Sequence, residues 1–245
     1  MTTNKRFWIP LKHQVCRWSM VLGVLVLCAA STNAKQRAIP NEIALNPFKR
    51  VFVVGNKNAT VILKQDTHYK ITVDGCSATD IKVNTTGDDL LISTISLDST
   101  QSLQIQITAP LFRDVNCSYV ALQSKDIISS TLEVTAISTN LDMTLYTDTL
   151  KLKFLDGSYA RLEGECKNAS LKCQGFDEGK RYTFDASKLV TQSVRAHCGV
   201  LSDIFLNVSD SIWLEDGIDS KISIVGSPVI LENNLKWSDI HIQNK

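Results

Sequence analysis

The 245-residue chain has few histidines and none of the common catalytic motifs. It contains four histidines, and the three beyond the N-terminal segment, His68, His197 and His241, are far apart and not at metal-ligand spacing. A Gly-X-Ser-X-Gly nucleophile elbow, a phosphate-binding loop and an HExxH motif are all absent from the sequence. We therefore assign no catalytic residue, no metal ligand and no cofactor, and we expect a protein that is not an enzyme.

The sequence also lacks basic runs, low-complexity segments and linkers. Its 26 lysines and arginines are balanced by 25 aspartates and glutamates, and it has only 11 glycines and five prolines. Binding to nucleic acid depends on clustered positive charge, so we do not expect nucleic acid as a partner. The length and the absence of a linker favour a single domain with one core.

Residues 1–34 have the pattern of a secretory signal peptide. An apolar run at residues 20–30 follows a positively charged start, and small side chains stand at Thr32 and Ala34. We expect cleavage after Ala34, because eleven apolar residues are too few for a permanent membrane span. An uncleaved anchor is one alternative, and lipid attachment at Cys28 is another, disfavoured because Leu27 precedes it. The positive residues are Lys5, Arg6, Lys12 and Arg17.

Removal of this leader changes the sign of the net charge. The leader holds four of the 26 basic residues and none of the 25 acidic ones, so the remaining chain has 22 against 25 and a charge of about −3. Residues 35–47 then form an irregular lead-in, since Pro40 and Pro47 disfavour regular structure. Residues 48–245 are the expected folded domain.

Residues 193–230 contain one unit of strand, tight turn and strand twice in succession. Weaker copies precede them, and the units start at residues 132, 150, 171, 194 and 212, which are 18, 21, 23 and 18 residues apart. Apolar residues fall at every second position, which places them on one face of each strand. A single rung cannot bury that face alone, so this repeat predicts an all-β fold, a β-solenoid built from stacked rungs.

The part of the domain before residue 110 also reads as short strands separated by turn residues. We expect this part to continue the stack or to cover its open end. The expected strands are residues 51–54, 59–63, 69–73, 81–83, 90–93 and 103–108.

Three stretches in the later rungs are characteristic: YTFDASKL at 182–189, the Cys198-Gly199 turn and ISIVGSPV at 222–229. Through them the chain resembles the head GIN domain family of bacterial putative auto-transporter adhesins over about residues 48–232. Family members read Gly-Ser-Gly at the rung turns and close on an aromatic-Gly-Asn-Pro signature, whereas this chain closes on VGSP at 225–228. The resemblance implies a right-handed parallel β-helix in an exported bacterial protein of the periplasm or cell surface. It implies no catalytic residue and no defined ligand.

Acidic residues beside the rung turns are the first candidate binding surface. Asp156, Glu178 and Asp216 each precede a glycine, and Asp219 lies close to the last of these turns. Stacked rungs could align them to hold Ca²⁺ or to face a sugar. Tight turns explain the same residues, because aspartate tolerates left-handed backbone geometry, and we prefer this explanation. Trp213, together with Trp237, is the second candidate, as a sugar-stacking surface, although a buried or capping role is more common for tryptophan.

Five cysteines follow the leader, and an odd number leaves at least one unpaired in an oxidising compartment. Cys166 and Cys173 flank a corner at residues 167–170 and are the one candidate disulfide. The alternative is that all five are small buried apolar side chains.

Three functional classes remain open. The favoured one is a non-catalytic binding module or adhesin of the cell envelope that contacts a glycan or a protein through one solenoid face. The second is a polysaccharide-degrading enzyme on the same scaffold, and the third is a purely structural envelope protein. The sequence does not choose among them without the family resemblance.

Overall fold

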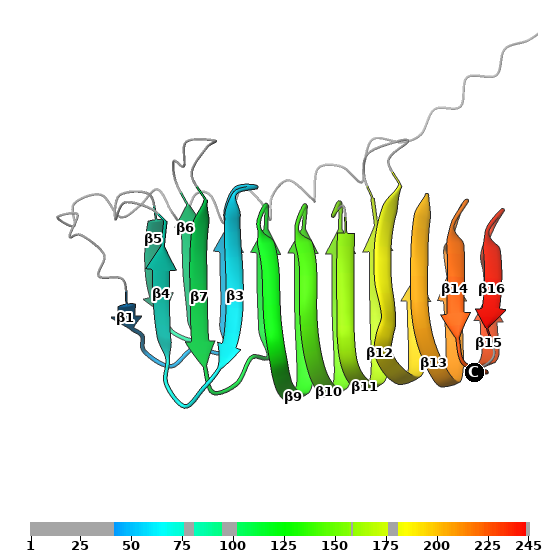
Figure 1. Ribbon diagram of the computed structural model, residues 1–245, viewed down its shortest axis with the longest axis horizontal. Coiled ribbons are helices and arrows are strands. Elements are labelled where there is room, and N and C mark those ends of the chain that lie inside the picture. Colours follow the sequence, from blue (N-terminus) through cyan, green and yellow to red (C-terminus); the bar gives the residue numbers. More distant parts are fainter. Residues whose placement is uncertain (1–41, 76–80, 95–101, 158, 176–180, 244–245) are drawn as a thin grey trace, which may run out of the picture. The chain divides into compact units, whose positions relative to one another are not determined.

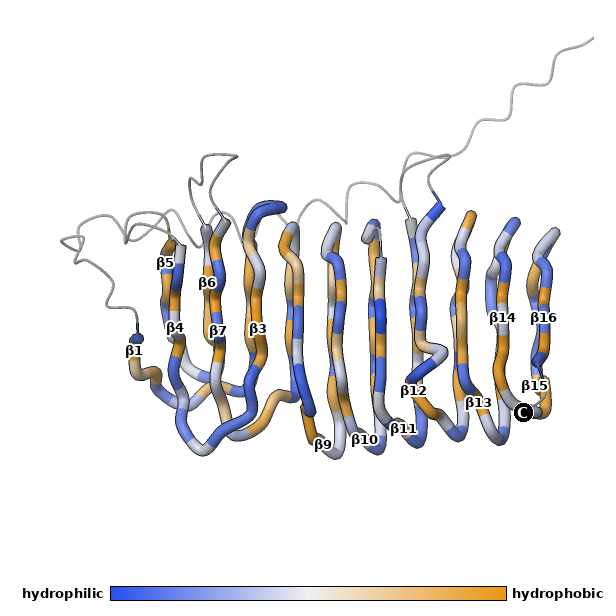
Figure 2. The backbone as a smooth tube through the Cα atoms, viewed as in Figure 1, coloured by the Kyte–Doolittle hydropathy of each residue, from blue (hydrophilic) through white to orange (hydrophobic). Residues whose placement is uncertain are grey.

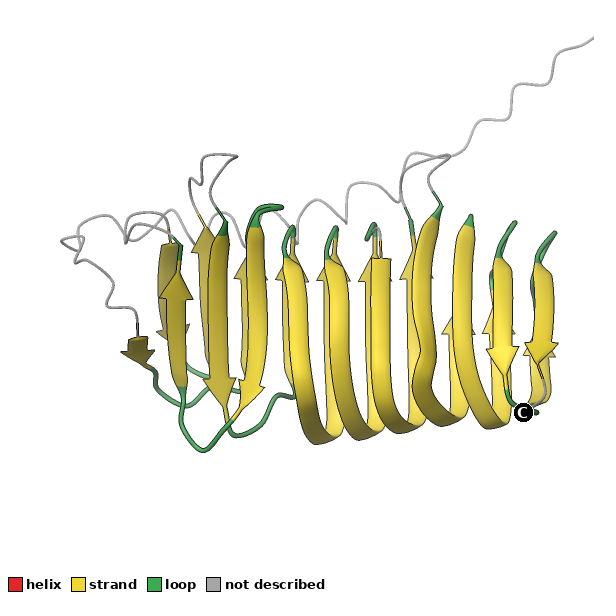
Figure 3. Cartoon of the chain, viewed as in Figure 1, coloured by secondary structure: helices red, strands yellow, loops and turns green. Residues whose placement is uncertain are grey.

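The chain forms a stack of β-rungs, described in a computed structural model for residues 42–75, 81–94, 102–157, 159–175 and 181–243 (Figure 1). All regular structure in these residues is β-strand, and the strands join in one 16-stranded sheet. Figure 3 shows the turns gathered at the ends of the rungs. The predicted all-β solenoid is therefore confirmed.

Five long strands make the regular part of the stack. Each pairs with the next in parallel, and their first residues are 19, 19, 23 and 20 positions apart. Figure 1 shows each ribbon bending near its middle and continuing on the other side of the stack. These strands are β9 (Ala121–Ile137), β10 (Asn140–Leu155), β11 (Tyr159–Gln174), β12 (Tyr182–His197) and β13 (Ser202–Glu215).

The bend divides every long strand into a leading and a trailing half, so the stack has two outer faces. We call these the leading face and the trailing face. The leading halves are residues 121–127, 140–146, 159–165, 182–190 and 202–208. The trailing halves are residues 131–137, 149–155, 168–174, 193–197 and 211–215.

The interior between the two faces follows from the alternation in the sequence. Along β10, buried and exposed residues alternate through most of the strand, and Figure 2 shows the same alternation as changes of colour along each tube. In the leading halves one buried column contains Leu122, Leu141, Ala160 and Phe184 in register. Phe154, from a trailing half, lies 6.1 Å from Phe184 between ring centroids and so packs the trailing halves against the leading halves. All buried apolar residues belong to one cluster.

The stack ends in a divided rung and a final short strand. β14 (Lys221–Val225) pairs with the leading half of β13, and β15 (Val229–Asn233) pairs with its trailing half. β16 (Asp239–Gln243) pairs with β14 and lies at the end of the sheet.

The N-terminal part both continues the stack and departs from it. β2 (Arg50–Val54) with β3 (Ala59–Gln65), and β7 (Leu103–Ala109) with β8 (Asp114–Ser118), pair in parallel with their rung neighbours. The remaining strands add antiparallel pairs: β1 (Glu42–Ala44) with β4 (Lys70–Asp74), β4 with β7, and β5 (Ile81–Thr86) with β6 (Asp89–Thr94). β6 also pairs in parallel with β2. Each strand expected before residue 110 is found, shifted by a few residues at its ends.

Two sequence expectations need correction. The repeat that we started at Leu171 is out of register, because Leu150 pairs with Ala169 and Leu171 pairs with Leu152. The disulfide between Cys166 and Cys173 is not formed, and both thiols are free and buried. The two residues lie on one strand, seven positions apart, which is roughly 20 Å of extended chain and far beyond disulfide reach.

The described cysteines are part of the apolar interior instead. Burial raises the pKa of the Cys117 thiol to about 12 and that of Cys166 to about 11. Thiols with such pKa values are almost wholly protonated at neutral pH and are poor nucleophiles. Cys76 lies outside the described residues.

Candidate functional site

The predicted acidic turn residues adopt the backbone geometry that tight turns require. Asp156, Asp216 and Asp219 have φ angles of 54°, 48° and 51°. This left-handed conformation is one that aspartate tolerates better than most residues. The Asp156 carboxylate also accepts a hydrogen bond from Ser138 Oγ at 3.1 Å, which ties together two consecutive turns.

The structure does not bring these acidic residues into one column. Asp156 follows β10, whereas Asp216 and Asp219 follow β13, three rungs later, a separation of roughly 14 Å. Asp216 faces His197, with 3.3 Å between Oδ2 and Nδ1, and Asp219 lies 3.9 Å from Arg181. Among the residues described here, no group of three or more His, Cys, Asp or Glu side chains could hold a metal ion. Glu178 lies outside the described residues.

Trp213 occupies a different place, on the trailing face. The indole is half-buried on β13, and the Arg195 guanidinium carbon lies 5.6 Å from its ring centroid, a cation–π contact. Arg195 Nε also lies 3.4 Å from Glu215 Oε1. Two neighbours from β13 thus fix the Arg195 side chain, which remains 58% exposed.

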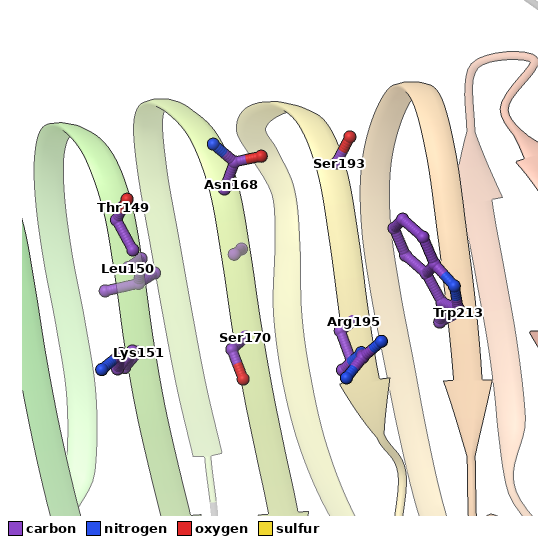
Figure 4. A pocket seen from close by; sticks show the side chains of 9 residues that line it. Thr149, Leu150, Lys151, Asn168, Ser170, Ser193, Arg195 and Trp213 are labelled. Atoms are coloured by element: carbon purple, nitrogen blue, oxygen red, sulfur yellow. The ribbon is translucent and has the colours of Figure 1, made fainter.

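Trp213 and Arg195 form one end of a shallow depression of about 210 Å³ that crosses β10 to β13 (Figure 4). This volume is smaller than the ~300 Å³ of the smallest drug-sized pockets, so it suits one small group such as a single sugar ring. Its lining residues include hydroxyl, amide and cationic side chains and one aromatic ring, while the surface open to the depression is mostly apolar. The lining residues are Thr149, Leu150, Lys151, Asn168, Ala169, Ser170, Ser193, Arg195 and Trp213.

Strand register explains why these residues meet. Lys151 pairs with Ser170, Ser170 with Arg195, and Arg195 with Trp213, so four successive rungs supply one outward row. A second row, two residues earlier, consists of Thr149, Asn168 and Ser193. The sequence pointed to Trp213 but not to Lys151 or Arg195. Finding them would have required the register between β11 and β12, across the longest spacing in the regular stack.

The trailing face that carries the depression is positively charged. Its five half-strands contain four basic residues, Lys151, Lys153, Lys172 and Arg195, against the two acidic residues Glu133 and Glu215. This local excess contrasts with the slightly negative charge expected for the chain without its leader.

In the part of the chain that the structure describes, no helix is long and apolar enough to cross a membrane.

A family model described as "Putative auto-transporter adhesin, head GIN domain" matches residues 48–228. Among curated proteins, none matches this sequence. The fold is similar to a crystal structure of a putative adhesin from Bacteroides fragilis, with a TM-score of 0.64, 18% identity, and coverage of 88% of this chain and 100% of that one. A putative adhesin from Parabacteroides merdae gives a TM-score of 0.59 and 12% identity over 86% of this chain and 97% of that one. A putative lipid binding protein from Parabacteroides distasonis gives a TM-score of 0.55 and 12% identity, with coverage of 82% of this chain and 95% of that one.

Proposed function

Because the chain belongs to the head GIN domain family of putative auto-transporter adhesins, we propose that it is a non-catalytic binding module of the bacterial cell envelope. It contacts a glycan or a protein through one face of the solenoid. The observation that carries this proposal is the open depression on the trailing face, where Trp213 adjoins hydroxyl, amide and cationic side chains. Aromatic rings beside hydrogen-bonding groups suit a partly apolar, partly polar ligand.

The proposed location is outside the cytoplasm, in the periplasm or on the cell surface. The signal-peptide pattern of residues 1–34 supports export, as does the description of the family and of two structural neighbours as adhesins. Cleavage after Ala34 would leave the chain without its apolar N-terminal run.

A catalytic role on polysaccharides receives less support from the geometry. Retaining and inverting glycosidases place two carboxyl groups within ~10 Å of each other across the scissile bond. Asp156 and Asp216 are three rungs apart instead, and no acidic side chain lines the depression. In this proposal the acidic turn residues stabilise the turns and have no catalytic role.

The test is binding of the purified protein to an array of bacterial and host glycans together with envelope and matrix proteins. A heat-unfolded sample of the same protein is the control. Saturable binding by the folded protein alone is the expected result. Equal binding by both samples, or no binding to any member of the array, would count against a binding module.

A further inference from the structure

Lys151 and Arg195 stand on either side of a short side chain in the depression. Ser170 lies between them in the strand register, and Figure 4 shows the three on successive ribbons. Neighbouring strands are ~4.8 Å apart, so the two cationic side chains start from backbone positions roughly 10 Å apart. The serine leaves the space between them open for part of a ligand.

The positive charge at this place is only partly neutralised by the protein, because Glu215 pairs with Arg195 and no acidic side chain pairs with Lys151 among the described residues. Among the described residues, Lys151 forms no salt bridge, since its neighbour Glu133 accepts from Lys153 Nζ at 3.3 Å instead. Arg195 Nε lies 3.4 Å from Glu215 Oε1. Within the same described ranges, no hydrogen bond from the Arg195 Nη atoms is formed, so these donors remain available to a ligand.

Hydroxyl and amide groups lie directly beside the two cations. Thr149, Asn168 and Ser193 form the adjacent row, one on each of the strands that carry Lys151, Ser170 and Arg195. Trp213 closes the end of the depression beyond Arg195. A planar guanidinium and an ammonium recognise an anionic group, while the adjacent row can exchange hydrogen bonds with hydroxyls.

We propose that this depression binds a negatively charged sugar, whose carboxylate or sulfate lies between Lys151 Nζ and the Arg195 guanidinium. The sugar hydroxyls face Thr149, Asn168 and Ser193, and Trp213 borders the ring. This inference rests on the proposed binding function and specifies the ligand class. Glycans of the bacterial envelope and of host surfaces both supply such sugars, and the shared chemistry is an anionic group on a hydroxylated ring.

The test measures binding of the purified protein to oligogalacturonate, to dextran sulfate and to neutral dextran by calorimetry. We expect saturable binding to at least one of the two anionic probes, none to dextran, and weaker binding as salt increases. Which anionic probe binds distinguishes a carboxylate ligand from a sulfate ligand. Lys151→Glu should reduce the affinity at least about tenfold, the usual loss when a hydrogen bond to a charged group is removed. Lys151→Arg should retain most of the binding.

The matched control is Lys221→Glu, which changes the net charge equally on the leading side of the stack. Lys221 is exposed on β14 and forms no salt bridge among the described residues, so this substitution should change affinity by less than about twofold. Equal losses from Lys151→Glu and Lys221→Glu would overturn the site, because they would indicate general charge attraction. Binding of neutral glycans or proteins in the array, without either anionic probe, would overturn this inference and leave the proposed function standing. No saturable binding to any of the three probes or to any member of the array would contradict both.

Discussion

The leading and trailing faces share one interior but carry opposite charge. The leading half-strands contain six acidic and three basic residues, and the trailing half-strands contain two acidic and four basic residues. On the leading face Glu163 forms salt bridges with both Arg161 and Lys188, whereas Lys151 on the trailing face forms none among the described residues. The buried residues determine which positions point outward. The outward-facing residues of the two faces can then differ in charge without changing the fold. This difference in charge is one reason why we propose the trailing face as the ligand-binding face.

The largest expected effect comes from breaking the interior that both faces share. Phe154 is 1% exposed and its ring contacts Tyr182 and Phe184 of the leading halves, at 6.2 Å and 6.1 Å between centroids. Phe154→Ala should lower the free energy of unfolding by about 3–5 kcal/mol through lost burial and a cavity. Urea denaturation measures the change. Tyr146→Ala, at a side chain that is 40% exposed, is the control and should have a much smaller effect. A loss below about 1 kcal/mol for Phe154→Ala would contradict packing between the leading and trailing halves.

A smaller but specific effect is expected at the bend that separates the two faces. Gly164 has a φ of 113°, and a Cβ there would lie 2.0 Å from the Leu145 carbonyl oxygen of the preceding rung. Gly164→Ala should therefore destabilise the protein by roughly 2 kcal/mol or more, since both strain and a backbone clash oppose it.

Gly87 provides the matched control for this substitution. It also has a positive φ, 59°, but a Cβ there would meet no atom within 4 Å. Gly87→Ala should destabilise by about 1 kcal/mol, from backbone strain alone. Equal effects at the two glycines would show that close contact between rungs does not constrain the bend.

The smallest effect concerns the paired charges of the leading face. Hydrogen bonds from Lys188 and Arg161 hold the pKa of Glu163 below its usual 4.5. A lowered folded-state pKa gives stability that is present above the unfolded pKa and is lost as the pH falls through the folded pKa. Glu163→Gln should therefore slightly reduce stability near neutral pH and flatten the loss of stability below about pH 4.5. Unfolding curves across this range test the prediction, and identical acid profiles for the two proteins would refute it.

The stack and its rung length could be predicted from the sequence because alternation and spacing are local signals. The register between rungs could not be predicted, because a shift of two residues keeps every apolar side chain on the buried face. The repeat that we started at Leu171 contains such a two-residue shift. A better signal was present in LSDI at 201–204, DSKI at 219–222 and WSDI at 237–240. Each motif begins with a left-handed residue, and Ser202 donates to Ser220 Oγ at 2.8 Å between two of these turns.

The candidate site was predicted only in part for a related reason. Trp213 is conspicuous by its residue type, but Lys151 and Arg195 are ordinary exposed cations until the rungs are aligned. Ser170 lies between them because of the register of β11 with β10 and β12. The loops between these strands differ in length, so the sequence spacing does not reveal that register. The strand β4 was expected as a strand, but its antiparallel direction depends on long-range pairing with β1 and β7.

The central claim, that ligand binds the trailing face, is tested most directly by oxidative footprinting with and without the ligand found in the array. Trp213 reports on the trailing face, and Tyr159, which is 40% exposed, reports on the leading face. We expect ligand to protect Trp213 from oxidation and to leave the oxidation of Tyr159 unchanged. Protection of Tyr159 with no change at Trp213 would contradict this claim.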